Sequence, residues 1–314
     1  MQAKLKLGLH TLFMNIQKFI VLPKFIIIIF VLLSAVFIAY HDGLNNNFLT
    51  TWDTQGYVIN NVHIRAFNWE NIQWMFTSFQ MENWHPLTWL SHALDYALFE
   101  LEPWGHHLVS IIIHGLNTVL LFLLVIVLVS FKSSTENADG LLARVDNKTL
   151  LAAGIAALLF GIHPQHVESV VWVAERKDVL CLFFMLLTVL SYVFYVAART
   201  TKARLSWYLS TLLCFILALL AKPMAVTLPV ILLLMDVYPL QRISFITTSR
   251  QRDNVSALES PGFFVRMREA LVLVFEKIPF FAFTLFSVII TIKAQHHGGA
   301  IFTAPKKLDK VGHF

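Results

Sequence analysis

The membrane topology depends on one polar segment, HPQHVESVVWVAERKD, at residues 163–178. It carries two imidazoles, three acids and two bases between long apolar runs. Because an ionised side chain is costly to bury in hydrocarbon, this segment must lie outside the bilayer or line a wet cavity. It therefore separates two membrane spans and is a candidate functional site, with an ordinary polar loop as the alternative.

Composition places the rest of the chain in a membrane. Of its 314 residues, 57% are hydrophobic and 14% are charged, and the mean hydropathy is +0.67. Only helices and closed barrels span a bilayer, and the apolar runs here are continuous rather than alternating. We therefore predict an all-α polytopic membrane protein. The net charge of +5 requires no nucleic-acid partner, because basic cytoplasmic loops facing a lipid bilayer account for it.

Three regions are expected along the chain. Residues 1–23 form a basic amphipathic segment at the membrane interface, residues 24–293 form the transmembrane domain, and residues 294–314 start an outer loop that is cut short. Length and flanking residues predict seven spans, at residues 26–40, 107–131, 150–162, 179–198, 205–221, 224–240 and 278–292.

Basic residues orient these spans. If the short apolar stretch at residues 86–99 is not a span, only eight of the 24 Lys and Arg residues fall on the side opposite the N-terminus. Counting this stretch as a span would distribute the Lys and Arg residues over both sides of the membrane. The positive-inside rule therefore predicts a cytoplasmic N-terminus, with residues 163–178 on the outer face.

The first outer loop, residues 41–105, differs in character from the spans. Seven acids stand against one base, Arg65, and six of the eight tryptophans of the chain fall here. Amphipathic aromatic side chains prefer the headgroup level. We expect this loop to lie on the membrane, with one interfacial helix capped by Asn68 and another at residues 86–99.

Three polar patches fall on the outer face: the loop around Asp53 and His85, residues 163–178, and Lys222. A carboxylate, imidazoles and cations together suit a reaction on a lipid-linked phosphate, because the cations hold the phosphate and the acid takes a proton. The alternative for the cations is that they anchor span ends at the headgroups.

Several sequence blocks resemble, in order, those of bacterial relatives of the transmembrane-and-tetratricopeptide-repeat O-mannosyltransferases. The blocks are Trp52-Asp53 with Tyr57-Val58, Asn83 to His92, His106 to Val109, residues 163–178, Lys222 to Met224 with Thr227 to Pro229, and Glu276 to Phe280. The resemblance extends from about Trp52 to Gly299. It implies a GT-C-like helix bundle, whose superfamily takes sugars from a polyprenyl phosphate on the outer side of the membrane. The bacterial relatives also imply a bacterial inner membrane.

The resemblance implies transfer of a sugar, such as mannose, from a polyprenyl-phosphate donor to a hydroxyl of a protein Ser or Thr or of a glycolipid. Asp53 is the implied catalytic base. The implied donor and phosphate contacts are His85, His163, His166, Glu168, Arg176, Lys177, Asp178 and Lys222.

No metal ligand is assigned from the sequence. A divalent metal has weak support, because the family usually pairs two acids where this chain has Asp53 followed by Thr54. A zinc site at His163, His166 and Glu168 matches no HExxH-type spacing.

Two other functional classes remain open, a lipid-linked sugar flippase or transporter component and an inactive truncated scaffold. A transporter should carry polar residues through the middle of several spans, whereas here charge clusters at one face. Family members also carry C-terminal helical repeats, and no 34-residue repeat occurs in this sequence. A downstream partner chain with helical repeats could supply them.

Overall fold

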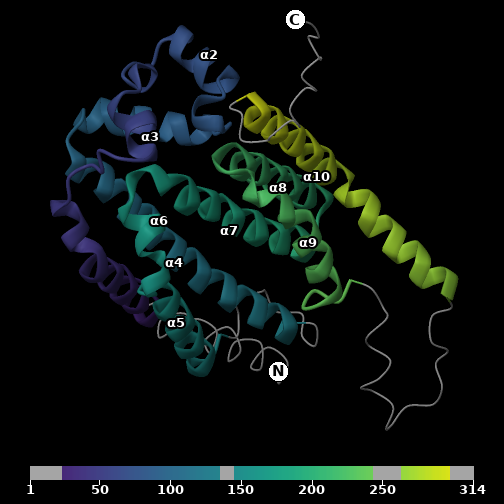
Figure 1. The fold of residues 1–314 in the computed structure, drawn as a ribbon. Helices are drawn as coiled ribbons and strands as arrows, with labels where there is room; N and C mark the ends of the chain where they lie inside the picture. Colours follow the sequence, from purple (N-terminus) through teal and green to yellow (C-terminus); the bar gives the residue numbers. More distant parts are fainter. Residues whose placement is uncertain (1–22, 135–144, 243–262, 298–314) are drawn as a thin grey trace, which may run out of the picture.

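A computed structural model describes residues 23–134, 145–242 and 263–297 (Figure 1). Within these ranges every regular element is a helix or a helical turn, which confirms the predicted all-α class. The amphipathic segment predicted at residues 1–23 and the outer loop predicted at residues 294–314 lie almost wholly outside the described residues.

Five described helical segments are long and apolar enough to cross a membrane. They are Pro23–Asn45, Pro103–Phe131, Val173–Ala197, Thr201–Ala221 and Met267–His297. A sixth candidate is a bent pair, Asn147–Gly161 with Pro164–Val171, whose parts meet at 48°. The chain is thus a multi-pass membrane protein with five or six described candidate spans.

The structure contradicts the membrane span predicted at residues 224–240. Its helix, α9 (Leu228–Val237), has only 10 residues, about half the length that a bilayer requires. A short turn over Pro223–Thr227 precedes it. Residues 223–237 therefore form a shorter apolar helical segment rather than a seventh full-length span.

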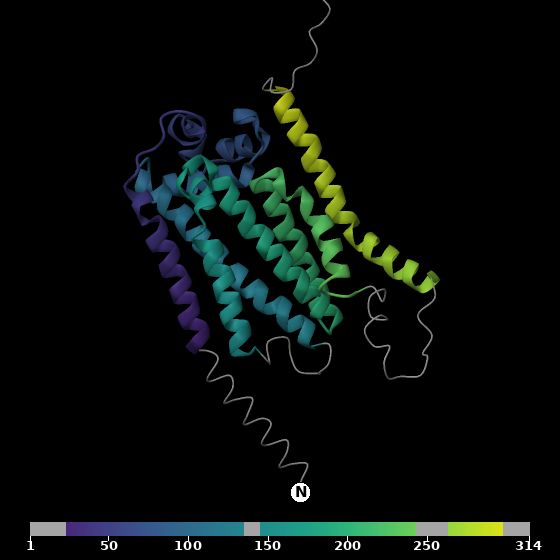
Figure 2. The same cartoon turned by 60° about the horizontal axis from the view of Figure 1, so that its bottom comes forward.

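Helices α4 (Pro103–Ser134), α5 (Asn147–Gly161), α7 (Arg176–Ala197) and α8 (Thr201–Ala221) form the centre of the bundle. Helix α7 packs against α8 and α4, and α4 also packs against α5 (Figure 2). Apolar side chains such as Phe215 and Leu190 fill the core between these helices, because each helix presents apolar residues at helical spacing.

Close packing of α4 on α5 depends on Gly161. A Cβ atom at this position would lie 2.9 Å from two side-chain atoms of Thr118. His114 Nε2 donates a hydrogen bond to the Gly161 carbonyl at 2.9 Å. This contact satisfies a carbonyl at the end of α5, where helical partners run out.

Short helices of the first outer loop cover one end of the bundle (Figure 2, blue). They include α2 (Trp69–Thr77) and α3 (Pro86–Phe99). Asn68 caps α2 as predicted, because its side chain accepts a hydrogen bond from the Asn71 backbone N–H at 2.8 Å. Helix α3 coincides with the predicted short helix at residues 86–99 and begins at Pro86, a residue favoured in the first helical turn.

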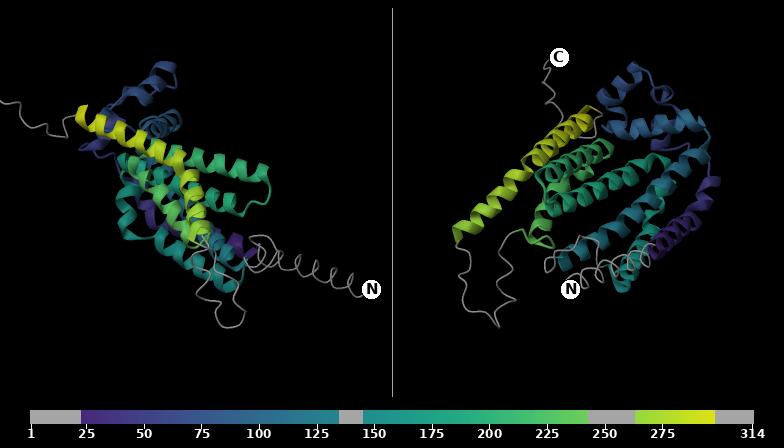
Figure 3. Two further views of the ribbon diagram at one scale, coloured as in Figure 1. Left: turned by 90° about the vertical axis from the view of Figure 1, so that its right-hand side faces the viewer. Right: turned by 180° about the vertical axis from the view of Figure 1, so that it is seen from behind.

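Helix α10 (Phe263–His297) crosses the side of the bundle and bends along its length, with Pro279 inside it (Figure 3). A buried ion cluster joins it to α9. Lys277 Nζ lies 2.8 Å from Asp236 Oδ2 and 2.7 Å from Glu276 Oε1. Arg242 Nη2 lies 2.8 Å from Glu276 Oε2. Every charge in the cluster is paired, as burial in a bundle requires.

Candidate active site

Three segments that are far apart in the sequence meet at the covered end of the bundle. Trp172 Nε1 donates to Thr54 Oγ1 at 2.9 Å, which joins residues 163–178 to the first loop. Thr88 Oγ1 donates to the Ala221 carbonyl at 2.9 Å, which joins α3 to the end of α8. The structure thus brings the predicted polar patches together.

Five charged side chains form a continuous line across this end, here called the charge line: Asp53, Lys177, Glu175, Lys222 and Asp178. Lys177 Nζ lies 3.5 Å from Asp53 Oδ2 and 2.8 Å from Glu175 Oε1. Lys222 Nζ lies 3.5 Å from Glu175 Oε2 and pairs closely with Asp178 Oδ1. Three carboxylates alternate with two ammonium groups, so each ammonium group has carboxylate oxygens as charge-assisted partners.

Accessibility differs along the charge line. The Asp53 side chain is 35% exposed, whereas the Lys177 side chain is 7% exposed. Lys177 Nζ also lies 4.8 Å from the centre of the Tyr57 ring, a cation–π contact that holds the ammonium group in place. Asp53 is therefore the most accessible carboxylate of the charge line, next to a cation in a fixed position.

His85 and Lys222 have shifted pKa values at the charge line. Burial, and then the charges of Lys177 and Lys222, lower the pKa of His85 to about 3. Burial alone would lower the pKa of Lys222, but Asp178 and Glu175 outweigh it and raise this pKa. At neutral pH the site therefore holds a neutral imidazole beside a charged ammonium group, and the buried Nδ1 of His85 has no hydrogen-bond partner.

Arg176 precedes Lys177 but does not join the charge line. Its guanidinium is fully buried and lies 2.7 Å from Asp95 Oδ2. It also donates to Ser110 Oγ at 2.8 Å, Ser91 Oγ at 3.0 Å and the His106 carbonyl at 2.6 Å. Successive helical residues point about 100° apart, so neighbours in sequence can face opposite surroundings. These contacts favour a structural role for Arg176 over the predicted donor contact.

His163, His166 and Glu168 also lie apart from the charge line. His163 is exposed, and its Nδ1 accepts a hydrogen bond from the Gln165 N–H at 3.3 Å. The His166 ring packs on Phe160 with ring centres 4.6 Å apart. The exposed Glu168 lines a separate cavity. Among the described residues, none of the three forms a hydrogen bond or an ion pair with Asp53 or with either lysine of the charge line.

One group within the described ranges has the spacing of metal ligands: His92, Asp95 and His106, whose ligand atoms lie within 4.8 Å of one another. All three are buried, and the group differs from both metal sites considered from the sequence. The guanidinium of Arg176 already neutralises Asp95. A divalent ion would place two more positive charges beside a buried cation, which is costly. The group therefore fits a charge-paired structural cluster better than a metal centre.

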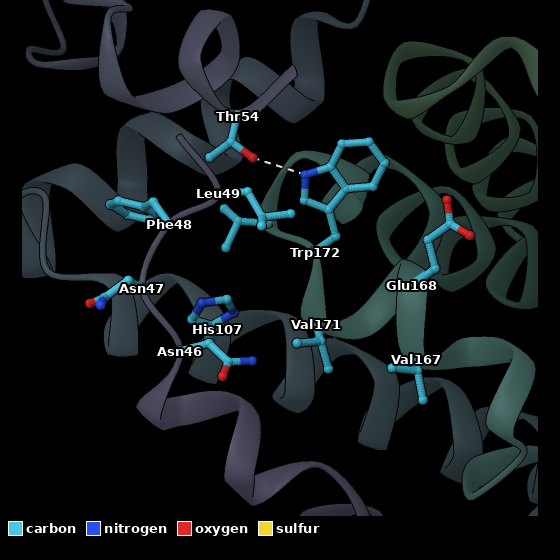
Figure 4. Close-up of a pocket in the computed structure, with 11 residues that line it drawn as sticks. Asn46, Asn47, Phe48, Leu49, Thr54, His107, Val167, Glu168, Val171 and Trp172 are labelled. Atoms are coloured by element: carbon cyan, nitrogen blue, oxygen red, sulfur yellow. Dashed lines mark hydrogen bonds between the residues drawn. The ribbon is translucent and has the colours of Figure 1, made fainter. Parts of the chain in front are cut away.

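A cavity of about 450 Å³ opens beside the charge line (Figure 4). Its walls include the polar side chains of Asn46, Asn47, Thr54 and Glu168 and the rings of His107 and Trp172. Sequence reasoning did not assign Asn46, Asn47 or Glu175 to the site. Glu175 lies inside the polar segment at residues 163–178, but nothing in that run of charges indicates which members converge.

Comparisons with known proteins confirm the resemblance to O-mannosyltransferases. Over 183 residues the chain is 31% identical to protein O-mannosyl-transferase TMTC2 of Mus musculus and 30% identical to that of Homo sapiens. Over 143 residues it is 32% identical to protein O-mannosyl-transferase Tmtc3 of Drosophila melanogaster.

These alignments cover 56%, 56% and 45% of this chain and 19%, 19% and 15% of the relatives. The matched part of the chain therefore spans less than a fifth of the length of these three relatives. No family model and no solved structure matches it. The names of the relatives, together with the membrane helices, support a membrane glycosyltransferase.

Proposed function

We propose that this chain is a GT-C-type glycosyltransferase that transfers a sugar, mannose in the first instance, from a polyprenyl phosphate to the hydroxyl of a protein Ser or Thr. The charge line carries this proposal, because it sets the accessible carboxylate of Asp53 beside the ammonium group of Lys177. The similarity to proteins named O-mannosyl-transferases supports the reaction and the acceptor class.

In the proposed complex the donor phosphate binds Lys177 and Lys222. Without a donor these ammonium groups are paired with Asp53, Glu175 and Asp178, so one negative charge is left over. The phosphate must therefore displace carboxylates from the lysines. The charge-assisted hydrogen bonds to the phosphate, each worth about 1.5–3 kcal/mol, replace those that the lysines lose to the carboxylates.

Displacement from Lys177 leaves the Asp53 carboxylate free to take the proton of the acceptor hydroxyl. The acceptor oxygen bonds to the anomeric carbon while the bond from that carbon to the phosphate oxygen breaks. The phosphate departs as a stable anion, so no second acid is needed. A single carboxylate and a single displacement invert the configuration at the sugar carbon.

The experiment uses the chain reconstituted in lipid vesicles with polyprenyl-phosphate mannose and a Ser/Thr peptide. We expect a mannosylated peptide whose anomeric configuration is opposite to that of the donor. A peptide with Ala at the acceptor positions is the control. Retention of configuration, or equal transfer from a nucleotide sugar, contradicts the proposal.

A lipid-linked sugar transporter is the second candidate, and one observation favours it. Asp236 and Lys277 are charged side chains buried among the helices, as expected of an ion or substrate pathway. All charges of that cluster are paired with one another, however, which favours a structural role. Two results together would support the transporter instead. Wild type would show no peptide glycosylation, and Lys277→Met would abolish the movement of a fluorescent lipid-linked sugar across the vesicle membrane.

A further inference from the structure

A buried tyrosine beside the charge line has no part in the steps proposed above. Tyr57 lies in a short helical turn, Gln55–Ile59, of the first outer loop. Its side chain is fully buried, and its hydroxyl makes no well-aligned hydrogen bond with any residue that the structure describes. A buried polar group without a partner destabilises a fold. We therefore expect this hydroxyl to gain a partner in another state of the protein.

Neighbouring side chains fix the ring of Tyr57. The Trp89 ring packs on it with ring centres 4.4 Å apart. On the preceding residue, Gly56, a Cβ atom would clash with the Met81 side chain, so the turn is closely packed. The ammonium group of Lys177 lies 4.8 Å from the centre of the Tyr57 ring. Because the ring cannot swing toward a partner, the partner must move to the hydroxyl.

Asp53 is an acceptor that can make this movement. It precedes Tyr57 by four residues, and helical backbone extends from one to the other. Side chains four residues apart are neighbours on the surface of a helix. Asp53 Oδ2 also lies 3.5 Å from Lys177 Nζ, the ammonium group that contacts the Tyr57 ring. The carboxylate and the phenol are therefore gathered around one cation.

The charges around the phenol keep its proton in place. Burial, and then the negative charges of Asp53 and Glu175, raise the pKa of Tyr57. The nearby Asn83 side chain lowers this pKa by less. The hydroxyl is therefore protonated at neutral pH and can donate a hydrogen bond. A carboxylate is a strong acceptor for such a donor, because the bond is charge-assisted.

We infer that Tyr57 positions the catalytic base: when the donor phosphate displaces Asp53 from Lys177, the Tyr57 hydroxyl donates a hydrogen bond to the released carboxylate. The assignment rests on the proposed function. One oxygen of Asp53 then accepts from Tyr57, and the other faces the acceptor hydroxyl. A hydrogen bond to the charged form favours that form, so Tyr57 replaces part of the stabilisation that Lys177 gave to the carboxylate. Tyr57 acts through Asp53 and is a positioning residue.

Tyr57→Phe tests this role, because it keeps the ring and its contact with Lys177 and removes only the hydroxyl. Binding of polyprenyl phosphate is measured to the chain in nanodiscs. In the chain with Asp53, Tyr57→Phe should weaken binding about tenfold or more, because a hydrogen bond to a charged group that forms on binding is lost. In the Asp53→Asn chain, the same change should have little effect, because no carboxylate is released.

Two further readouts separate this role from a structural one. The acid limb of the pH profile of kcat should move to higher pH in Tyr57→Phe, because the charged carboxylate loses a donor. The free energy of unfolding should not fall, because the hydroxyl has no partner in the donor-free chain. Tyr208→Phe is the matched control, since the Tyr208 hydroxyl already donates to the Glu276 carbonyl at 2.9 Å. It should leave donor binding and the pH profile unchanged.

Each other outcome contradicts the inference in a different way. Equal losses in the two chains would mean that the hydroxyl binds the phosphate itself or acts through Glu175. Unchanged binding with lower stability in Tyr57→Phe assigns the hydroxyl to a structural partner such as Asn83. Unchanged binding and unchanged stability leave it without a role in donor exchange. These results overturn only this inference, whereas a wild-type chain that does not bind polyprenyl phosphate overturns the proposed function as well.

Discussion

At the scale of single residues, Lys222 is the cation of the charge line with the simplest test. Lys222→Gln removes one charge-assisted contact to the donor phosphate, worth about 1.5 kcal/mol or more. Donor affinity should therefore fall about tenfold in a binding titration with polyprenyl phosphate. Lys148→Gln is the matched control, because Lys148 is an exposed lysine at the start of α5 and is not part of the charge line. Equal affinities in wild type and Lys222→Gln would assign Lys222 to the carboxylates alone.

His85 predicts a pH dependence of stability. Its pKa is lowered from 6.5 to about 3 by burial and then by the two lysines, so the unfolded chain binds a proton more readily than the folded chain. The free energy of unfolding should therefore fall as the pH drops below 6.5, by up to about 1.4 kcal/mol per pH unit, until the pH approaches 3. Unfolding in detergent at pH 7, 6 and 5 measures this slope. His85→Gln should reduce this slope but not remove it, because buried His92 also has a lowered pKa. An unchanged slope in that variant would contradict the assignment.

The site was predictable from sequence as a set of residue types, and only in part as an arrangement. The outer-face location of Asp53, Lys177 and Lys222 was expected because charged residues must lie outside the hydrocarbon. The role of Asp53 as a base came from the family resemblance. The separation of Arg176 from Lys177 could not be predicted. A turn over Val173–Glu175 interrupts the helices, so no helical phase extends across the polar segment to show which base faces the site.

At the scale of elements, Arg176 joins the start of α7 to α3 and α4. Arg176→Met leaves the Asp95 carboxylate buried without its partner, and breaking such a pair costs about 3–5 kcal/mol. We expect this loss in the free energy of unfolding in detergent. Adding Asp95→Leu to the same chain should restore much of it, because the uncompensated charge is gone. Wild-type stability in the single variant would instead indicate that the guanidinium is solvated and available to a ligand.

Element boundaries followed from composition at several apolar runs, but α10 begins at Phe263, 15 residues before the span predicted at residues 278–292. Helix α8 was predicted within four residues at its start and correctly at its end, and α3 coincides with the predicted helix at residues 86–99. The run at residues 224–240 was wrongly predicted to be one span, because hydropathy does not show that the backbone divides into two short helical elements here. Pro223 and Pro229 lie in the first turns of two short elements, a position that proline tolerates at a helix start.

At the scale of the whole molecule, the distribution of basic residues predicts which ends of the helices face the cytoplasm. Asn45 and Gln165 should be outside and Thr200 inside, and all three are exposed. Single cysteines at these sites, in a chain lacking Cys181 and Cys214, can be treated with an impermeant thiol reagent. We expect Asn45→Cys and Gln165→Cys to be labelled in intact cells and Thr200→Cys only after permeabilisation. Labelling of Thr200→Cys in intact cells would reverse the topology.

The central claim is that Asp53 is the base for sugar transfer at the charge line. The most direct measurement compares Asp53→Asn with wild type in transfer from polyprenyl-phosphate mannose to a Ser/Thr peptide, with donor affinity measured on the same samples. Asp42→Asn, an exposed acid of the same loop, is the control. Asp53→Asn keeps the shape of the side chain but removes the base, so transfer should fall by about 10²–10⁴. Donor affinity should be retained or raised, because the phosphate no longer displaces this carboxylate from Lys177. Near-normal transfer by Asp53→Asn would contradict the claim.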